Sequence, residues 1–161
     1  MRRFLLLLPL LAAAHAVSAD TISGNVIAIP DGDTLTIIDR NKKRYRIRLA
    51  EIDAPERKQP YGTRSRNSLA EICFQKQAAA ETTEKDSYGR LIGKVSCAGV
   101  DANTEQVRRG MAWVNARATL PNSPLPEMEA NARLRKLGLW AGEMPEPPWK
   151  WRERQAAAAK K

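Results

Sequence analysis

The chain has 161 residues, which favours a single domain, and 43% of them are hydrophobic, which is enough for a packed core. Its formal net charge is +9, from 27 Lys and Arg against 18 Asp and Glu, and this favours a polyanionic partner. Two cysteines are too few for an iron–sulfur cluster or a four-cysteine metal site, and the one histidine, His15, lies in a segment that we expect to be removed. Any metal site must therefore use carboxylates, which select hard cations such as calcium or magnesium.

Residues 1–19 have the features of a secretory signal peptide. Two arginines precede an apolar run at 4–14, and small residues lead to a cleavage site after Ala19. A membrane anchor is the weaker alternative, because the apolar run is too short for a hydrocarbon core of about 30 Å. We expect an exported protein, periplasmic or secreted, with no stable membrane association after cleavage. Cleavage would also remove His15, which excludes Ser-His-Asp and Cys-His catalysis in the mature chain.

The first strands are predicted at residues 21–29, 34–39 and 43–52, where polar and apolar side chains alternate. In the second of these, Leu35 and Ile37 share one face. Turn residues separate the three segments, so they form a meander in which the second and third strands are a hairpin.

The rest of the domain mixes helices and strands. Apolar spacing predicts helices at 64–74, 100–110 and 124–136, and strands at 77–83 and 91–97. Three meander strands, a helix, two more strands and C-terminal helices indicate an α+β fold. We expect a five-stranded oligonucleotide-binding (OB) barrel over residues 20–143, with about three helices packed outside it.

A tail at 144–161 has a different composition. Its proline-rich start, at 144–148, favours an extended chain, and the Trp-Lys-Trp-Arg run at 149–152 could dock on the domain. The end, from Gln155, is expected to fray.

The two cysteines, Cys73 and Cys97, are expected to form a disulfide, because export would place this small domain in an oxidising compartment. Two separately buried thiols are the alternative. A loop of about 25 residues closed in this way would be stabilised by roughly 3.5 kcal/mol through chain entropy.

Two acidic motifs flank the predicted hairpin, Asp-Gly-Asp-Thr at 31–34 and Asp-Ala-Pro-Glu at 53–56. Either motif alone is more often an ordinary turn. In an antiparallel hairpin, however, the start of one strand meets the end of the next, so Asp33 and Asp53 would share one corner. Two neighbouring carboxylates repel unless a cation lies between them, so the pair indicates a hard-cation site.

Two arginines complete a candidate site. Arg48 is on the strand that leads to Asp53, and Arg90 follows a turn. Taken alone, each arginine would be interpreted as an ordinary surface residue. Guanidinium groups and a hard cation can together offset the charge on a five-coordinate phosphorus, and a carboxylate can activate water. This combination is what phosphodiester hydrolysis requires in a chain without histidine.

In order and spacing, these motifs resemble the staphylococcal nuclease (thermonuclease) family. The resemblance includes the runs at 31–34, 48–56, 86–90, 107–114 and 138–140, and it covers roughly residues 22–151. It implies an OB barrel and a calcium-dependent endonuclease that acts on DNA and RNA. Such an enzyme would direct water at phosphorus and release the 5′-oxygen.

The resemblance also implies a role for each matching residue. The metal ligands would be Asp33, Asp53 and the backbone carbonyl of Ala54, where the family commonly has Thr, and Glu56 would activate water. Arg48 and Arg90 would bind the phosphate, and Tyr88 matches an aromatic residue that contacts it. The family's base-stacking aromatics would fall near Asn115 and Ala116, which cannot stack.

Three functions compete at this point. A nuclease explains the clustered carboxylates, and we expect it to act as a monomer. A non-catalytic nucleic-acid-binding OB-fold module would need only the basic surface. A protein that binds envelope polyanions would need charge alone, and it leaves the acidic motifs unexplained.

Overall fold

The computed structural model describes residues 20–142 and 144–160, so the predicted signal peptide lies outside the described residues. Five strands form a barrel in the order β3-β2-β1-β5-β6, each pair antiparallel, and a parallel pairing of β3 with β6 closes it. The predicted five-stranded barrel is confirmed. The barrel strands are β1 (Asp20–Ala28), β2 (Thr34–Ile38), β3 (Arg44–Leu49), β5 (Gln77–Lys85) and β6 (Leu91–Cys97).

Three short strands were not predicted separately. They are β4 (Ile52–Asp53), β7 (Val100–Asp101) and β8 (Trp113–Val114). β7 extends the β6 edge of the sheet, and β4 pairs with β8 outside the barrel. The pairing of β4 holds the segment with the second acidic motif in a fixed place beside the hairpin.

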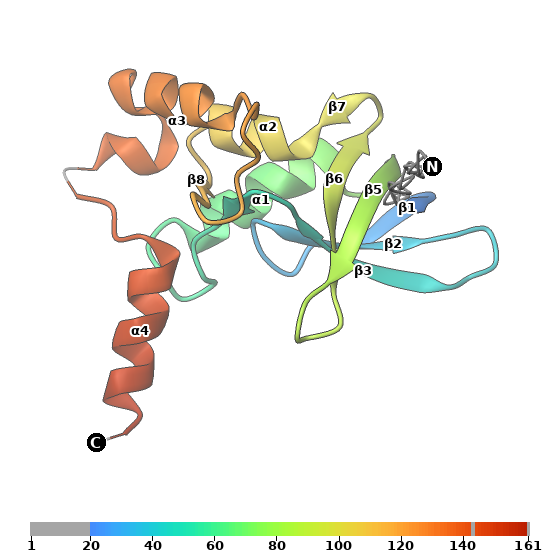
Figure 1. Ribbon diagram of the computed structural model, residues 1–161, viewed down its shortest axis with the longest axis horizontal. Helices are drawn as coiled ribbons and strands as arrows, with labels where there is room; N and C mark the ends of the chain where they lie inside the picture. The colour runs from blue at the N-terminus through green and yellow to red at the C-terminus, as the bar shows by residue number, and fades with distance from the viewer. Residues whose placement is uncertain (1–19, 143, 161) are drawn as a thin grey trace, which may run out of the picture.

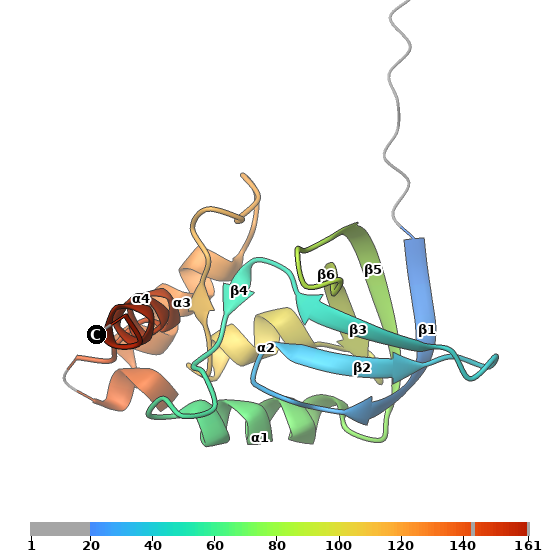
Figure 2. The ribbon, with the colours of Figure 1, turned by 90° about the horizontal axis from the view of Figure 1, so that it is seen from below.

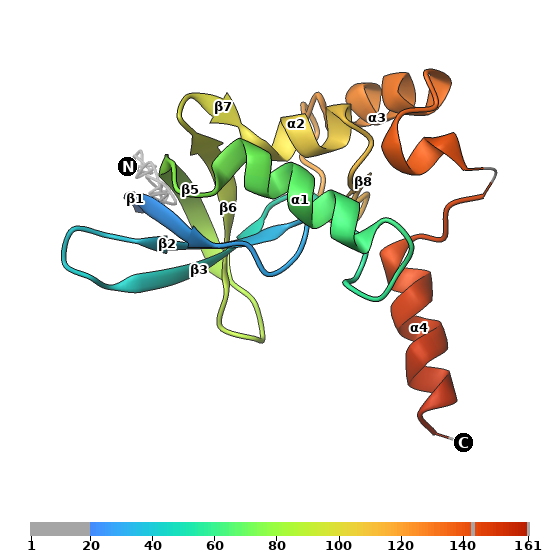
Figure 3. The ribbon, with the colours of Figure 1, turned by 180° about the vertical axis from the view of Figure 1, so that it is seen from behind.

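The helices lie outside the barrel, as expected. They are α1 (Gly62–Cys73), α2 (Ala102–Arg108), α3 (Leu125–Leu134), the 3-10 helix η1 (Gly138–Ala141) and α4 (Pro148–Ala158). α1 crosses the barrel beside α2, while α3 lies farther from the strands (Figure 3). Across residues 20–142 and 144–160, no helix has both the length and the hydropathy that a membrane crossing needs.

The tail differs from the sequence prediction. Instead of fraying from Gln155, the chain forms α4, which continues to Ala158 and projects away from the barrel (Figure 1), so that Figure 2 shows it end-on. Proline is tolerated in the first turn of a helix, where Pro148 lies, because its missing N–H has no partner there. The Arg, Glu, Gln and Ala residues that follow all favour a helix. Helix propensity therefore prevails over the compositional signs of disorder.

The barrel interior is made by the alternation seen in the sequence. Leu35 and Ile37 of β2 and Ile47 of β3 have no solvent exposure, and Leu49 is 1% exposed. A smaller cluster forms where Trp113 packs edge-on against Trp140, with ring centroids 5.3 Å apart. This cluster packs α3 and η1 against β8.

The loop between β1 and β2 is packed tightly against two helices. A Cβ atom on Gly32 would collide with the Ser65 hydroxyl of α1, so the position requires glycine. Gln106 of α2 donates from Nε2 to the Gly32 carbonyl over 2.7 Å. The first acidic motif is therefore held in place by two helices as well as by its own strand.

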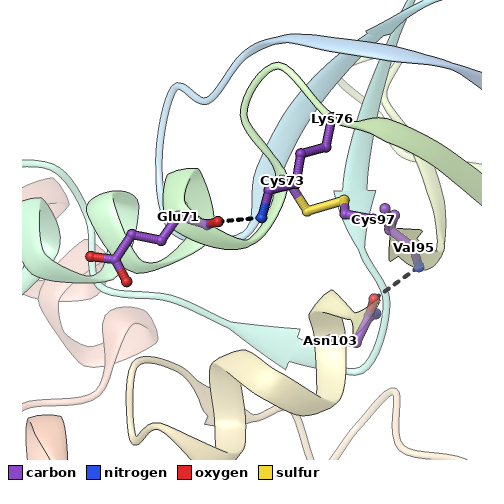
Figure 4. The surroundings of a disulfide bond; sticks show 6 residues. All are labelled: Glu71, Cys73, Lys76, Val95, Cys97 and Asn103. Atoms are coloured by element: carbon purple, nitrogen blue, oxygen red, sulfur yellow. Dashed lines mark hydrogen bonds between the residues drawn. A yellow bond between two sulfur atoms is a disulfide. The ribbon is translucent and has the colours of Figure 1, made fainter. Parts of the chain in front are cut away.

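The expected disulfide joins Cys73, at the end of α1, to Cys97, at the end of β6 (Figure 4). Both residues are fully buried. Beside it, Lys76 donates to the Glu71 carbonyl over 2.7 Å, and the Val95 amide donates to Asn103 over 3.0 Å. The bridge ties the crossing helix to the barrel.

Reduction of this disulfide is expected to lower the free energy of unfolding by roughly 3.5 kcal/mol, because it removes a loop constraint from the unfolded chain. Urea denaturation with and without reductant measures the difference, and the Cys73→Ala, Cys97→Ala double variant is the control that reductant should not affect. An unchanged midpoint in protein shown to carry two free thiols would contradict the expectation.

Candidate active site

The hairpin of β2 and β3 brings the two acidic motifs together, as the sequence analysis predicted. Thr34 is paired with Arg48, and the Leu49 amide donates to the Asp33 carbonyl over 2.8 Å. The Ala54 amide then donates to Asp33 Oδ2 over 2.9 Å, which joins the second motif to the first. Asp33 and Asp53 are each only 4% exposed. The sequence thus places two carboxylates at one buried corner.

One guanidinium group links these carboxylates. Arg48 Nη1 is 2.8 Å from Asp33 Oδ2, and Arg48 Nη2 is 3.2 Å from Asp53 Oδ1. Although burial disfavours the charged guanidinium, the two carboxylates raise the pKa of Arg48 above its ordinary value. Arg48 is therefore a permanent cation and the internal counterion of this corner.

The corner nevertheless holds more negative charge than Arg48 balances. Burial, and next the neighbouring charge of Asp33, raise the pKa of Asp31 from 3.8 to about 6. The two cysteines form a disulfide with each other, so neither thiol is free to bind a metal ion. The metal donors that this corner offers are therefore oxygens. Crowded carboxylates and oxygen donors fit a hard divalent cation. No group of three or more His, Cys, Asp and Glu with metal-binding geometry occurs at 20–142 and 144–160, so Asp33 and Asp53 would need further oxygen ligands.

A cavity of about 530 Å³ opens beside the corner. It is lined by residues from the first acidic motif, β3, the second motif, the turn before β6, and α4. They are Asp31, Asp33, Arg46, Arg48, Ala54, Pro55, Glu56, Asp86, Tyr88, Arg90, Ile92 and Arg152. Most of the predicted site residues therefore line one cavity, and Asp53 lies directly behind it, bonded to Arg48 and Arg152.

Arg90 reaches this cavity from the turn between β5 and β6. Asp86 fixes that turn, because its carboxylate accepts from the amides of Tyr88 and Arg90 and from Arg90 Nε at 2.7 Å. Arg90 Nη1 is also 3.4 Å from the Thr34 hydroxyl. Tyr88 lies at the mouth, 82% exposed, with its ring 5.5 Å from the Arg90 guanidinium. Asp86 was missed as an orienting residue, although it opens the run that identified Arg90.

Arg152 is the member of the site that sequence reasoning did not find. From α4, it forms ion pairs with Asp53 over 2.7 Å and with Glu56 over 2.9 Å. The tail was expected to dock on the domain, but no spacing signal linked a tail arginine to residues almost 100 positions earlier in the chain.

The predicted base-stacking positions lie apart from this cavity. Asn115 lines a second cavity of about 360 Å³, which shares Arg48 with the first. Trp113, the nearest aromatic residue in the sequence, is 3% exposed and packs on Trp140. Trp113 is thus a core residue, and it cannot replace a stacking aromatic.

A barrel of this kind, with paired carboxylates and arginines in one cavity, defines a class of phosphodiester-cleaving proteins, and comparison with known proteins agrees. The family model described as staphylococcal nuclease homologue matches residues 46–142. An uncharacterized endonuclease of Escherichia coli is 37% identical over 156 residues, which are 96% of this chain and 100% of the relative.

Two further relatives carry nuclease names. A micrococcal nuclease of Shigella flexneri is 35% identical over 163 residues, covering 88% of this chain and 93% of the relative. A staphylococcal-like nuclease of Arabidopsis thaliana is 36% identical over 111 residues, covering 69% and 34%. The chain belongs to the staphylococcal nuclease family, and it is a nuclease.

The burial of Asp31, together with the neighbouring charge of Asp33, is expected to make stability depend on pH. Its pKa is about 6 in the folded chain against an ordinary value of 3.8, so stability is lost as pH rises from 3.8 to 6. Asp31→Asn removes this loss and keeps the oxygen that accepts from the Asp33 amide. In chelator at pH 8, the variant is expected to be more stable than the wild type by about 1–3 kcal/mol.

Urea denaturation between pH 4 and pH 8 measures this difference, which should narrow toward pH 4. A difference that stays constant with pH would show that Asp31 ionises normally in the folded chain.

Proposed function

We propose that this nuclease is a calcium-dependent endonuclease that hydrolyses phosphodiester bonds of DNA and RNA. Water would attack phosphorus and the 5′-oxygen would leave. The observation that carries the proposal is the one cavity lined by Arg48, Glu56, Arg90 and the buried Asp33, with the buried Asp53 bonded to Arg48 beside it. The family membership supports the same chemistry.

The metal site would be the hairpin corner. Asp33, Asp53 and the carbonyl of Ala54 would hold calcium, because they combine charge with oxygen donors that this hard ion prefers. When bound, the ion would neutralise charge that develops on the phosphate oxygens. The main-chain ligand explains how Ala54 can stand where the family commonly has Thr, since no side-chain atom is required.

The arginines would bind the reacting phosphate. Arg48 enters the cavity from β3 and Arg90 from the turn just before β6, and the two are neighbours because β3 and β6 pair in parallel. Guanidinium groups form paired, charge-assisted hydrogen bonds to phosphate oxygens, and these strengthen as charge accumulates on phosphorus. Asp86 would orient Arg90, and the exposed Tyr88 would contact phosphate at the mouth.

Glu56 would be the general base. Its side chain is 42% exposed, against 5% for Asp53, so it can meet a water molecule that the buried carboxylates cannot. A positioned carboxylate of this kind can take the proton from attacking water. The difference in burial thus assigns different roles, because the buried Asp33 and Asp53 would bind the ion and the accessible Glu56 would activate the water.

Export is part of the proposal. The charged start and apolar run at 1–19 support a cleaved signal, and the disulfide is typical of proteins in an oxidising compartment. The mature chain would be a monomeric nuclease domain at 20–143 with a tail at 144–161, periplasmic or secreted and not stably attached to a membrane.

A non-catalytic nucleic-acid-binding module is the second candidate, favoured by the net charge of +9. It needs neither buried carboxylates nor a water-accessible glutamate. Substitutions that leave binding intact and remove cleavage separate the two candidates.

Digestion of plasmid DNA and of RNA is expected to require calcium and to stop in chelator. Asp33→Asn and Asp53→Asn should abolish it at modest calcium, because each removes a charged ligand. Asp20→Asn, which changes an exposed carboxylate on β1, is the matched control and should digest normally. Full wild-type digestion in chelator would refute calcium dependence.

Glu56→Gln is expected to lower turnover by about 10²–10⁴-fold with little change in DNA affinity, because it removes the base and keeps the size. Arg48→Lys and Arg90→Lys should also lower turnover sharply, since lysine cannot form paired bonds to phosphate. Single-turnover cleavage and binding assays measure both quantities, with the exposed Glu127→Gln as control. Wild-type cleavage by all three variants would place the active site elsewhere.

A further inference from the structure

Arg152 lies in the active site although it belongs to the C-terminal helix. Its Nη2 donates to Asp53 Oδ2 over 2.7 Å, and its Nη1 donates to Asp53 Oδ1 over 3.2 Å and to Glu56 Oε1 over 2.9 Å. The region that matches the family model ends at residue 142, before α4 begins. A residue outside the matched region therefore contacts two of the carboxylates assigned to catalysis.

We propose that Arg152 competes with the metal ion for Asp53, so that docking of α4 and binding of calcium exclude each other. This inference rests on the calcium site proposed above. The tail helix is then a built-in counterion that occupies the site until enough calcium is present to displace it.

The argument starts from the oxygen atoms of Asp53. Oδ2 accepts from Arg152, and Oδ1 accepts from both Arg152 and Arg48. A calcium ion on Asp53 would lie within a few ångströms of the Arg152 guanidinium, and like charges at that distance repel strongly in a partly buried site. Asp53 can therefore bind either the calcium ion or the Arg152 guanidinium, but not both at once.

Arg152 is the more easily displaced of the two arginines on Asp53. Its side chain is 47% exposed, whereas Arg48 is 19% exposed and is fixed within β3. Besides Asp53, Arg48 has two further acceptors at this corner, Asp33 Oδ2 and the main-chain carbonyl of Ile52. Arrival of a cation is thus expected to release the tail arginine and to leave β3 in place.

The helix itself is held lightly. Pro148 is its single buried residue within Pro148–Ala158, and Trp149 is 38% exposed. Arg154 pairs with Glu146 in the same tail, and so does not bind the helix to the barrel. Gln59 donates to the Glu146 carbonyl just before the helix. The start of α4 is tethered, while the ion pairs of Arg152 hold the rest of it, which projects from the barrel (Figure 1).

Calorimetric titration of calcium chloride into the full mature chain, without nucleic acid, tests the competition. Arg152→Gln is expected to bind calcium at least about 10-fold more tightly than the wild type, because the ion no longer has to break charge-assisted bonds to Asp53. Arg154→Gln removes the same charge from the same helix, but its partner is Glu146. The calcium affinity of Arg154→Gln should stay within about twofold of the wild-type value. This comparison separates direct competition for Asp53 from a general effect of the helix charge.

Amide hydrogen exchange gives a second readout of the helix. In the wild type, calcium is expected to increase exchange at residues 150–158, and Arg152→Gln should exchange fast there with or without calcium. An equal or weaker calcium affinity in Arg152→Gln, or unchanged exchange in wild-type α4 on addition of calcium, would overturn the inference. A loss of turnover with unchanged calcium affinity would make Arg152 a positioning residue for Glu56.

Failure of this inference differs from failure of the proposed function. If the wild type binds calcium and digests DNA in it, while Arg152→Gln binds calcium no more tightly, only the competition is wrong. If the wild type neither binds calcium nor digests DNA in its presence, the calcium site is wrong and the competition falls with it.

Discussion

The burial of two carboxylates at one hairpin corner is the constraint on which the rest of this structure depends. Asp33 and Asp53 are almost inaccessible, and charges so placed are costly unless other charges and hydrogen bonds compensate them. The structure supplies Arg48 as a bridge and the Ala54 amide as a donor. Ser65 of α1 and Gln106 of α2 hold the Gly32 loop in place. The apolar barrel is thus the support that keeps a strained electrostatic arrangement in place.

The same constraint explains the balance of charges around the cavity. Acidic residues are concentrated at its base, and arginines approach from β3, from the turn before β6 and from α4. A site of this kind attracts cations and phosphates together. A cation compensates only the carboxylates, and a phosphate compensates only the arginines. In the proposed function, the net positive charge of the chain would serve binding over a wide surface, while the carboxylates of the cavity would serve the chemistry at one point.

Local patterns in the sequence predict most of the barrel and much of the site. Alternation of side chains identifies β2 and β3, and antiparallel geometry then places Asp33 beside Asp53. Pairings between distant segments leave no such pattern. The parallel contact of β3 with β6, the two-residue strands β4 and β8, and the Arg152 contact across 99 residues all fall in this group. The tail helix was missed because its composition also suits a disordered end.

The parallel seam between β3 and β6 has a consequence for how the site comes into being. Ile47 pairs with Leu91 and Arg48 with Ile92, so Arg48 and Arg90 become neighbours only when this seam has formed. Strands joined over some forty intervening residues pair late in folding, because closing a long loop costs entropy before any contact repays it. A chain with an open barrel has the acidic hairpin and the arginines of β3, but Arg90 is not yet beside them. We therefore expect that a chain whose barrel is still open cannot place both arginines of the proposed active site side by side.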